Sequence, residues 1–456
     1  MDLIWNTISL AVTTALLSLL IGTWFAWGEQ RGLYAGKKIL CILNLLPLAI
    51  PSYLLAGTLR ETFGRIFTGF WPTVIVLLLI TIPYVQLIIS STLMRISRNE
   101  EDAARILGCT PWQVFYKIIL PQLRPGLAFA WLLIQLYVIS DFGAIAILDY
   151  PALTWRLYQA VTLYQLDRAL LLSGYLLLLT LPVLIIGRLI HRHMGQYRGM
   201  PNPQIAEAKK LSACQKLFTY FLHILLIGLG FILPVCALAS WVWNGLAQQL
   251  SFAPLTEYIS DTLIIGLSGS LFILLIAFLS VRIKIQFIYM LNALPGILMA
   301  FAILFAALWF SRFAKGDGAL YGMLLKSGVL LLLGYTLRFL PNAHANLKPA
   351  VERLNPHLWD NARLLGASRW RWFWEIAVPA LFPSVSAAFI LVFLSILKEL
   401  PITLLLGNAM GVHMLNFRIF DRYQEALLHD AGLAGLVLLT ISLCFVLLTH
   451  RWRHYV

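Results

Sequence analysis

Residues 102–125 read DAARILGCTPWQVFYKIILPQLRP, and residues 360–383 read DNARLLGASRWRWFWEIAVPALFP. The two stretches align without a gap at a constant offset of 258 residues. Identical pairs include Arg105/Arg363, Gly108/Gly366, Trp112/Trp370, Phe115/Phe373, Ile118/Ile376, Pro121/Pro379 and Pro125/Pro383. An ungapped match of this length indicates an internal repeat, and the repeat decides how the rest of the chain is organised.

Each copy predicts a helix, a tight turn and a second helix. Gly108 is expected to take the positive φ that ends the first helix. Thr110 then has the side chain of a helix N-cap, with Pro111 at the first helical position. Gly366 and Ser368 occupy the matching places in the second copy.

The two stretches resemble the EAA loop of bacterial ABC importer permeases. That loop has the pattern Glu-Ala-Ala, three residues, Gly, and then an apolar helix. Both copies depart from it by having Asp for Glu, and the second has Asn361 for the first Ala. In the family the loop inserts into a cleft on an ATPase subunit, so the resemblance implies docking loops within residues 95–125 and 342–383. The implied docking residues are Asp102, Ala103, Ala104, Gly108, Asp360, Ala362 and Gly366.

The composition is that of a membrane protein. Hydrophobic residues make up 60% of the chain and charged residues 12%, against roughly 25% charged residues in a soluble domain. The net charge of +14 does not predict nucleic-acid binding, because the basic residues cluster at the ends of apolar runs. About eleven runs approach the roughly 20 residues that span a bilayer. They are residues 3–28, 39–59, 70–93, 126–148, 169–190, 217–243, 262–281, 287–310, 319–341, 384–406 and 430–450.

The sequence therefore predicts an all-α polytopic membrane protein with two tandem parallel repeats, which resemble the halves of a type I ABC importer permease. The first half is residues 1–190, the linker is residues 191–216, and the second half is residues 217–456. Residues 217–243 form an extra span in the second half, and a start site placed too late would explain the difference equally well.

Lys and Arg are concentrated in the segments that lie inside if the N-terminus is outside. This bias predicts a cytoplasmic C-terminus, a cytoplasmic linker and two cytoplasmic loops. The expected location is the bacterial inner membrane.

Two dipeptides mark equivalent places in the halves. Asn6-Thr7 opens the first span and Asp261-Thr262 opens the seventh. We expect both pairs to be helix N-caps, because Asn and Asp are capping residue types.

An acidic residue lies within one span of each half. Asp141 and Glu399 are 258 residues apart. A carboxylate at mid-span costs on the order of 3 kcal/mol or more unless it has a partner. Our hypothesis is that both residues, with Lys398 beside Glu399, line the translocation path or its gate. Two structural alternatives stay open: pairing with Lys398, and early helix ends at Gly143 and Pro401.

Prolines occur at matching places in the two halves. Pro51 in the second span and Pro295 in the eighth are expected to bend their helices, since proline frees a backbone carbonyl. These bends either line the pathway or only serve packing. Pro121 and Pro379 are expected to end the second helix of each repeated loop.

Residues 141–144, DFGA, and residues 398–401, KELP, resemble the ferric-iron branch of fused permeases. The resemblance implies an importer of ferric iron that receives its cargo from an extracytoplasmic solute-binding protein. It also implies a separate ATP-binding cassette ATPase, expected as a homodimer. Thiamine, sulfate or molybdate, polyamines and phosphonates are alternative substrates of the same importer class.

A secondary transporter is the alternative class of function, because internal repeats and mid-membrane carboxylates fit it as well. Secondary transporters often have inverted repeats, whereas both repeated loops here are expected on one side of the membrane. The loop motif therefore favours the ATP-driven importer.

No catalytic motif is present in the sequence. It contains no GxxxxGK[ST], HExxH or GxSxG pattern. We therefore expect no enzyme, no metal site and no cofactor in this chain, and we expect the lipid bilayer, the ATPase and the binding protein as its partners. The cysteines form no CxxC pair or disulfide framework; they are Cys41, Cys109, Cys214, Cys236 and Cys444.

The charge bias gives a testable topology. In a cysteine-free background, Gln113→Cys and Arg371→Cys should react with a membrane-impermeant thiol reagent only after the membrane is permeabilised. Labelling of either position in intact cells would contradict the predicted orientation.

Overall fold

The structure is a computed structural model, and the part of the chain that it describes is helical almost throughout. The described residues are 2–96, 98–194, 209–281, 291, 294–313, 328–353, 362–364, 366–407 and 411–453. The chain divides into two compact units, Met1–Ala237 and Leu238–Val456. In the described residues the only strands are β1 (Gly32–Leu33) and β2 (Lys209–Lys210), which form one short parallel pair. The predicted all-α class is confirmed.

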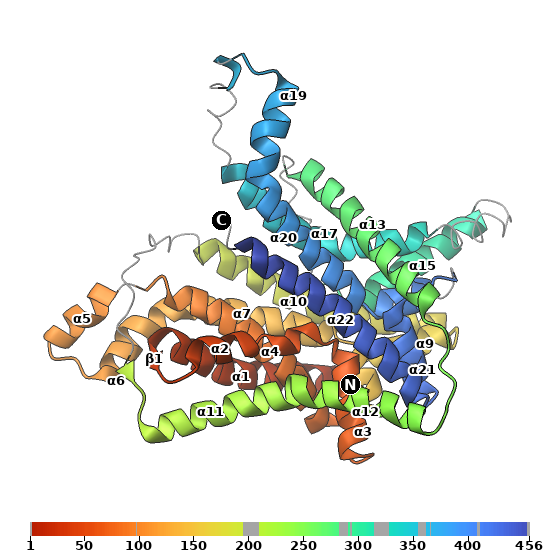
Figure 1. Cartoon of the computed structure of the whole chain (residues 1–456), viewed down its shortest axis with the longest axis horizontal. Helices are drawn as coiled ribbons and strands as arrows, with labels where there is room; N and C mark the ends of the chain where they lie inside the picture. The colour runs from red at the N-terminus through yellow and green to blue at the C-terminus, as the bar shows by residue number, and fades with distance from the viewer. Residues whose placement is uncertain are drawn as a thin grey trace. The chain divides into compact units, whose positions relative to one another are not determined.

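In the first unit, three long helices form the core. α1 packs along α4, both contact α7, and α10 packs on α7 and α9. The elements are α1 (Asp2–Arg31), α2 (Lys37–Leu43), the 3-10 turn η1 (Leu46–Ala49), α3 (Ser52–Phe63), α4 (Phe70–Leu93), α5 (Arg98–Ile106), α6 (Pro111–Val114), the π-helical turn η2 (Phe115–Ile119), α7 (Leu120–Ser140), α8 (Gly143–Ile147), α9 (Leu153–Thr162), α10 (Leu166–Met194), α11 (Ala213–Ile227) and the π-helical turn η3 (Gly228–Ile232) (Figure 1). α12 (Leu233–Ala247) continues from η3 and crosses the boundary between the units.

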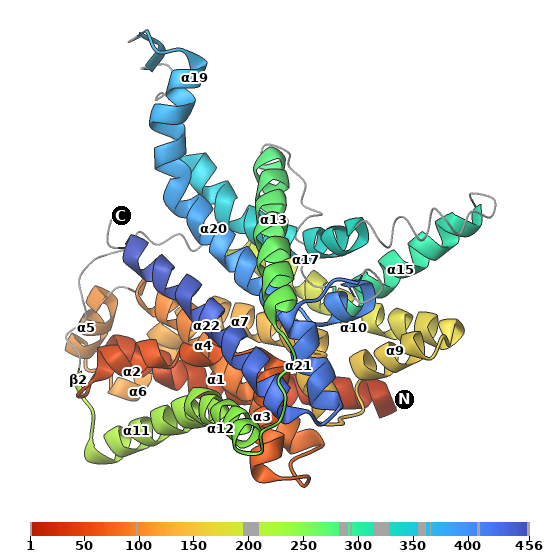
Figure 2. The same cartoon turned by 45° about the vertical axis from the view of Figure 1, so that its right-hand side comes forward.

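The second unit repeats this packing. α13 packs on α17, both contact α20, and α22 packs on α20 and α21. Its elements are α13 (Thr256–Ser280), α15 (Gly296–Phe313), α17 (Val329–Arg353), α19 (Arg369–Trp372), the π-helical turn η4 (Phe373–Ala377), α20 (Val378–Lys398), the π-helical turn η5 (Thr403–Gly407), α21 (Leu415–Gln424) and α22 (Leu428–Arg453) (Figure 2).

Glycines allow the core helices of each unit to approach closely. A Cβ added at Gly22 of α1 would lie 2.5 Å from the Cβ of Val85 in α4. A Cβ at Gly266 of α13 would lie 2.7 Å from Cε2 of Phe393 in α20. Small residues at such contacts are typical of helix packing in membranes, where dispersion contacts rather than hydrophobic burial hold helices together.

Fewer helices than expected are long enough to span a membrane. Among the described residues there are 8 such helices, or up to 9 if Lys37–Ala49 and Ser52–Phe63, which meet at 95°, are one broken span. Gly296–Phe310 is apolar but shorter. The predicted count of about eleven is thus not reached, and the predicted runs 287–310 and 319–341 include residues outside the described ranges. The long apolar helices nevertheless agree with the prediction of a polytopic membrane protein.

Helix α11 packs on the preceding helices of the first unit. Trp24 Nε1 donates to Thr219 Oγ1 at 3.1 Å, and the Tyr220 hydroxyl donates to the Ala35 carbonyl at 3.0 Å. The first compact unit therefore extends to Ala237, whereas the sequence analysis starts the second half at residue 217. The halves and the cytoplasmic linker stay predictions, and residues 195–208 of that linker lie outside the described part.

A chain of hydrogen bonds, buried at its centre, joins α11 to α1. The Tyr34 hydroxyl lies 3.1 Å from His223 Nε2, and His223 Nδ1 lies 2.8 Å from Asn44 Oδ1. Asn44 Nδ2 donates to Gln86 Oε1 at 2.9 Å, and Gln86 Nε2 donates to Glu29 Oε2 at 3.1 Å. Because the Asn44 oxygen can only accept, we assign the His223 proton to Nδ1, so that Nε2 accepts from Tyr34. Every bond in the chain then points toward the Glu29 carboxylate.

Candidate functional site

The first repeated loop ends its leading helix as the sequence predicts. Gly108 has φ +84, its amide donates to the Arg105 carbonyl at 3.0 Å, and the Cys109 amide donates to the Ala104 carbonyl at 3.0 Å. These two bonds form the Schellman motif, which satisfies the last carbonyls of a helix. The Ala104 carbonyl therefore supplies an acceptor inside the turn, and the residue is buried.

A capping box starts the second helix of this loop. The Gln113 amide donates to Thr110 Oγ1 at 3.3 Å, and the Thr110 amide donates to Gln113 Oε1 at 2.9 Å. The predicted cap at Thr110 is confirmed, and the Thr-x-x-Gln spacing is the sequence signal for its reciprocal partner.

The second repeated loop has the same geometry where the structure describes it. Gly366 has φ +77, its amide donates to the Arg363 carbonyl at 3.0 Å, and the Ala367 amide donates to the Ala362 carbonyl at 2.9 Å. Ser368 Oγ accepts from the Arg371 amide at 3.2 Å. The predicted roles of Gly366 and Ser368 are confirmed. Asp360, a predicted docking residue, lies outside the described residues.

The exposed face of each loop carries large apolar side chains. In the first loop Asp102, Ala103 and Gly108 are exposed, whereas Ala104 is buried, and Ala362 is buried in the second. Exposed apolar side chains of this size mark a surface that meets a protein partner or the membrane. The sequence analysis paired Trp112 with Trp370 but placed none of these side chains among the docking residues, although apolar residues beside a turn glycine were the available signal. Those more than half exposed are Ile106, Leu107, Trp112, Tyr116, Leu364, Trp370 and Trp374.

The prediction that Pro121 and Pro379 end the second helices is wrong. Helix continues from Trp112 to Ser140 and from Arg369 to Lys398. A π-helical turn precedes each proline, and Leu120 donates to the Phe115 carbonyl across it. The wider turn shifts the hydrogen-bond register, so the proline falls in the first turn of the next helical segment, where its missing amide costs little.

Asp141 lies where α7 ends rather than inside a continuous span. Its backbone is extended, with ψ 132, and its Oδ1 accepts from the Ala144 amide at 3.0 Å at the start of α8. Its side chain also hydrogen-bonds to Ser52. Its own carbonyl accepts from Thr154 Oγ1 at 2.9 Å. The predicted span 126–148 is thus interrupted, and the structural alternative of an early helix end near Gly143 is the one observed.

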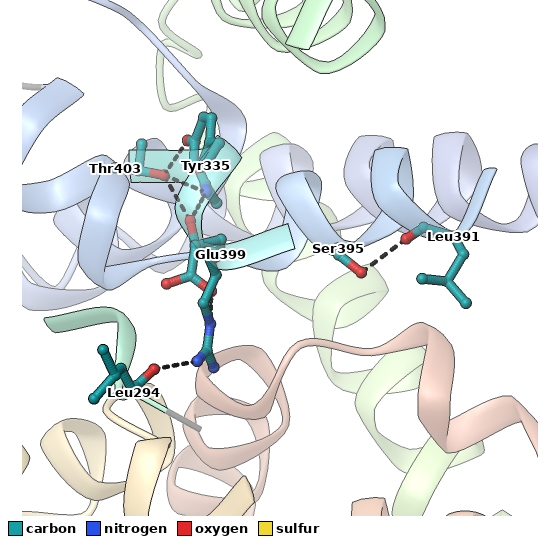
Figure 3. Close-up of polar contacts among 8 residues, drawn as sticks. Leu294, Tyr335, Leu391, Ser395, Glu399 and Thr403 are labelled. Carbon is teal, nitrogen blue, oxygen red and sulfur yellow. Dashed lines mark hydrogen bonds and ion pairs between the residues drawn. The ribbon is translucent and has the colours of Figure 1, made fainter. Parts of the chain in front are cut away.

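Glu399 occupies the matching break at the end of α20. Its carbonyl accepts from Thr403 Oγ1 at 2.6 Å and from Asn416 Nδ2 (Figure 3). The Tyr335 hydroxyl lies 2.7 Å from Thr403 Oγ1, so it holds one of the two side chains that donate to this carbonyl. The predicted span 384–406 therefore breaks after Lys398, which is the last residue of α20.

The Glu399 carboxylate lies against the segment that starts α15. Its Oε2 is 3.9 Å from Nε of Arg338, and the Arg338 guanidinium also donates to the Leu294 carbonyl (Figure 3). A Cβ added at Gly296 would overlap Glu399 Oε1. Glu399 thus has a cationic neighbour on α17, which the sequence analysis did not identify.

Pro51 and Pro295 begin helices rather than bend continuous ones. Pro51 is the N-cap of α3, and Pro295 directly precedes α15. The Leu54 and Leu298 amides donate to the two proline carbonyls at 3.1 and 3.0 Å. The bend expected at Pro51 is present, because Lys37–Ala49 and Ser52–Phe63 meet at 95° across it, although the helix breaks there instead of continuing. Pro295 starts α15, and residues 292–293 before it lie outside the described part of the chain.

Each unit therefore brings its predicted acidic residue next to its predicted proline. Asp141 reaches Ser52, next to Pro51, and Glu399 reaches Gly296, next to Pro295. Breaks of this kind place polar backbone inside the apolar region, which is typical of sites that line a cavity. Whether either pair of residues lines a path stays a prediction.

The expectation that residues 6–7 and 261–262 are N-caps is wrong. α1 begins at Asp2 and α13 begins at Thr256, so both pairs lie inside helices. Thr7 Oγ1 instead accepts from the Leu153 amide at 3.1 Å, and Thr262 Oγ1 accepts from the Leu415 amide at 2.9 Å. The threonines thus hold the first amides of α9 and α21, which the local sequence could not reveal.

Comparison with known proteins places the chain in a transport family. The family described as "Binding-protein-dependent transport system inner membrane component" matches residues 18–196 and 282–456. The Fe(3+)-transport system permease protein FbpB 2 of Haemophilus influenzae is 26% identical over 461 residues, which cover 97% of this chain and 88% of that protein. The sulfate transport system permease protein CysW is 28% identical over 161 residues in Escherichia coli K12, covering 32% of this chain and 55% of that protein. CysW of Synechocystis is 24% identical over 219 residues, covering 43% of this chain and 79% of that protein. No solved structure matches the chain.

The contact between Glu399 and Gly296 predicts a stability effect. Gly296→Ala should lower the unfolding temperature, because the new methyl group overlaps Glu399 Oε1 and moves the carboxylate from its place beside Arg338. The measurement is the unfolding temperature of the detergent-solubilised protein. Gly174→Ala is the matched control, because nothing lies within 4 Å of a Cβ at that position. Equal unfolding temperatures for both variants would contradict the observed packing.

Proposed function

This chain belongs to the family of binding-protein-dependent transport system inner membrane components, and we propose that it forms the membrane path of an importer for ferric iron. It is a permease of an ABC importer, a multi-pass membrane protein whose family works with an ATPase and a substrate-binding protein. The iron substrate, the form of the ATPase and the roles of individual residues are parts of the proposal.

The observation that carries the proposal is the duplicated loop. Both copies end a helix in a Schellman motif at a positive-φ glycine, and both expose large apolar side chains at matching positions such as Trp112 and Trp370. Two equivalent surfaces on one chain suit a partner that presents the same cleft twice. We therefore propose that a homodimeric ATPase binds one loop with each subunit and hydrolyses ATP outside this chain.

Ferric iron is favoured among the substrates of this importer class. The iron permease of Haemophilus influenzae aligns with 97% of this chain, whereas the sulfate permease of Escherichia coli aligns with 32%. Ferric iron requires hard oxygen ligands, and the carboxylates of Asp141 and Glu399 already contact Ser52 and Arg338. We infer that the binding protein, and not this chain, selects the metal.

The orientation proposed for the chain follows from its charges. With the N-terminus outside and the C-terminus in the cytoplasm, both loops face the compartment that contains ATP. A secondary transporter is the competing class of function. It works without an ATPase, so the repeated loops would have no protein to bind.

Substitution of the two turn glycines tests docking directly. A side chain at a positive-φ position costs roughly 1 kcal/mol, which is too little to unfold the bundle but enough to misplace a docking helix. Gly108→Arg and Gly366→Arg should leave the permease inserted and lower ATP hydrolysis and transport together. The assay is ATP turnover of the reconstituted complex with and without loaded binding protein.

Gly36→Arg is the matched control for this experiment. Gly36 also has a positive φ, of 71, and a Cβ there meets only the side chain of Leu40 at ordinary contact distance. This variant should keep full turnover. If the two loop variants combined also kept full coupled turnover, the loops would not dock the ATPase, and the secondary transporter would become the better account.

The two helix breaks give a second functional test. Asp141→Asn and Glu399→Gln should lower iron uptake while the complex assembles, because each removes a carboxylate from a break proposed to line the path. Glu399→Gln also strands the Arg338 charge, so Glu399→Gln with Arg338→Gln is the control that separates this effect. Uptake that stays unchanged in Asp141→Asn combined with Glu399→Gln, at equal membrane abundance, would reject the role.

A further inference from the structure

The first docking loop contains a buried charge that its proposed docking surface does not use. Glu101 of α5 is 4% exposed, and its Oε1 lies 2.5 Å from Nη2 of Arg31, the last residue of α1. The neighbouring Asp102 side chain is 55% exposed. Adjacent residues of the same helix thus face in different directions, Asp102 toward solvent and Glu101 toward its own chain.

The Arg31–Glu101 ion pair attaches α5 to the end of α1. Among the side chains of α5 whose burial the structure describes, only Glu101 and Ala104 are buried. Arg105, one turn later, adds a weaker contact to Glu101 at 3.7 Å and is itself 40% exposed. α5 is thus joined to α1 through the buried Arg31, and to α7 through the exposed bond from Gln122 to Glu100.

The end of α1 is in turn fixed to α4. Glu29, two residues before Arg31, accepts from Ser90 Oγ at 2.7 Å and from Gln86 Nε2 at 3.1 Å. Gln86 continues into the buried hydrogen-bond chain through Asn44. Within this unit, the ion pair with α5 and the hydrogen bonds to α4 thus lie two residues apart at the same end of α1, joined by its helical backbone.

We propose that the Arg31–Glu101 pair is a strut that transmits movement between the first docking loop and the membrane helices. The proposal rests on the proposed function, because it assumes that an ATPase moves α5. A buried pair has few alternative arrangements, since separating its members leaves two uncompensated charges. Continuous networks of salt bridges and hydrogen bonds are a physical route for coupling between sites. Arg31 and Glu101 are positioning residues in this account and touch neither ATP nor substrate.

The strut makes the two docking loops unequal. The position that matches Glu101 in the second copy is occupied by Trp359, which cannot form an ion pair. The first loop should therefore transmit the signal of the loaded binding protein more strongly than the second.

The test compares neighbouring glutamates in the complete complex of permease, ATPase and iron-loaded binding protein. Glu101→Gln should reduce the stimulation of ATP hydrolysis by loaded binding protein at least about fivefold, the lower range of typical coupling between sites. Basal hydrolysis and the amount of bound ATPase should not change, because the exposed docking surface is intact. Glu100→Gln is the matched control: Glu100 is exposed, accepts from Gln122 at 2.6 Å, and should retain full stimulation.

Reversing the charges of Arg31 and Glu101 separates an effect on coupling from an effect on folding. Arg31→Glu combined with Glu101→Arg should recover stimulation that Glu101→Arg alone loses, at equal membrane abundance. Full stimulation in Glu101→Gln, or a reversed pair that assembles but stays as weak as the single variant, would overturn the strut and leave the importer function standing. Absence of any ATPase stimulation in the wild-type complex would overturn both.

Discussion

The backbone of this chain must satisfy its own hydrogen bonds wherever it passes through lipid, because no water is available there. The two units nevertheless break their helices at matching places, after Ser140 and after Lys398. Side chains from other segments hydrogen-bond to the backbone groups that these breaks leave without a helical partner. Replacing one of these side chains by an apolar one would leave a buried backbone group without a partner, at a cost of about 1–3 kcal/mol. Thr154 Oγ1 donates to the Asp141 carbonyl, and Asn416 Nδ2 donates to the Glu399 carbonyl. Thr7 and Thr262 in turn accept from the first amides of the following helices α9 and α21. Specific hydrogen bonds thus stabilise the breaks, and the breaks position both acidic residues.

The units use the same plan with different charges. In the second unit Glu399 lies beside Arg338, whereas the position that matches Arg338 in the first unit is Ile80. In the first unit Asp141 interacts instead with the start of α8 and with Ser52. The two repeated loops differ in a comparable way, since Glu101 has no acidic counterpart in the second copy. A repeated architecture has therefore acquired two unequal halves, as expected if each half contributes differently to one pathway.

Local features were predictable from the sequence, and long-range contacts were not. The turns at Gly108 and Gly366 follow from residue types within a few positions, and their predicted conformations are confirmed. The ion pair of Arg31 with Glu101 joins residues seventy positions apart, and no periodicity in the sequence encodes it. The ends of the long spans were misplaced because apolar runs continue through the breaks at Asp141 and Glu399. Composition predicts that a segment lies in a membrane, but it does not report where a helix ends.

Reconstitution into vesicles tests the central claim, that this chain carries its substrate only when an ATPase drives it. Vesicles would contain the permease with its ATPase, and iron-loaded binding protein would be supplied on the side opposite the docking loops. The account predicts iron uptake that requires ATP and persists after ionophores have collapsed all ion gradients. Uptake driven by an ion gradient in vesicles that contain the permease alone would contradict it.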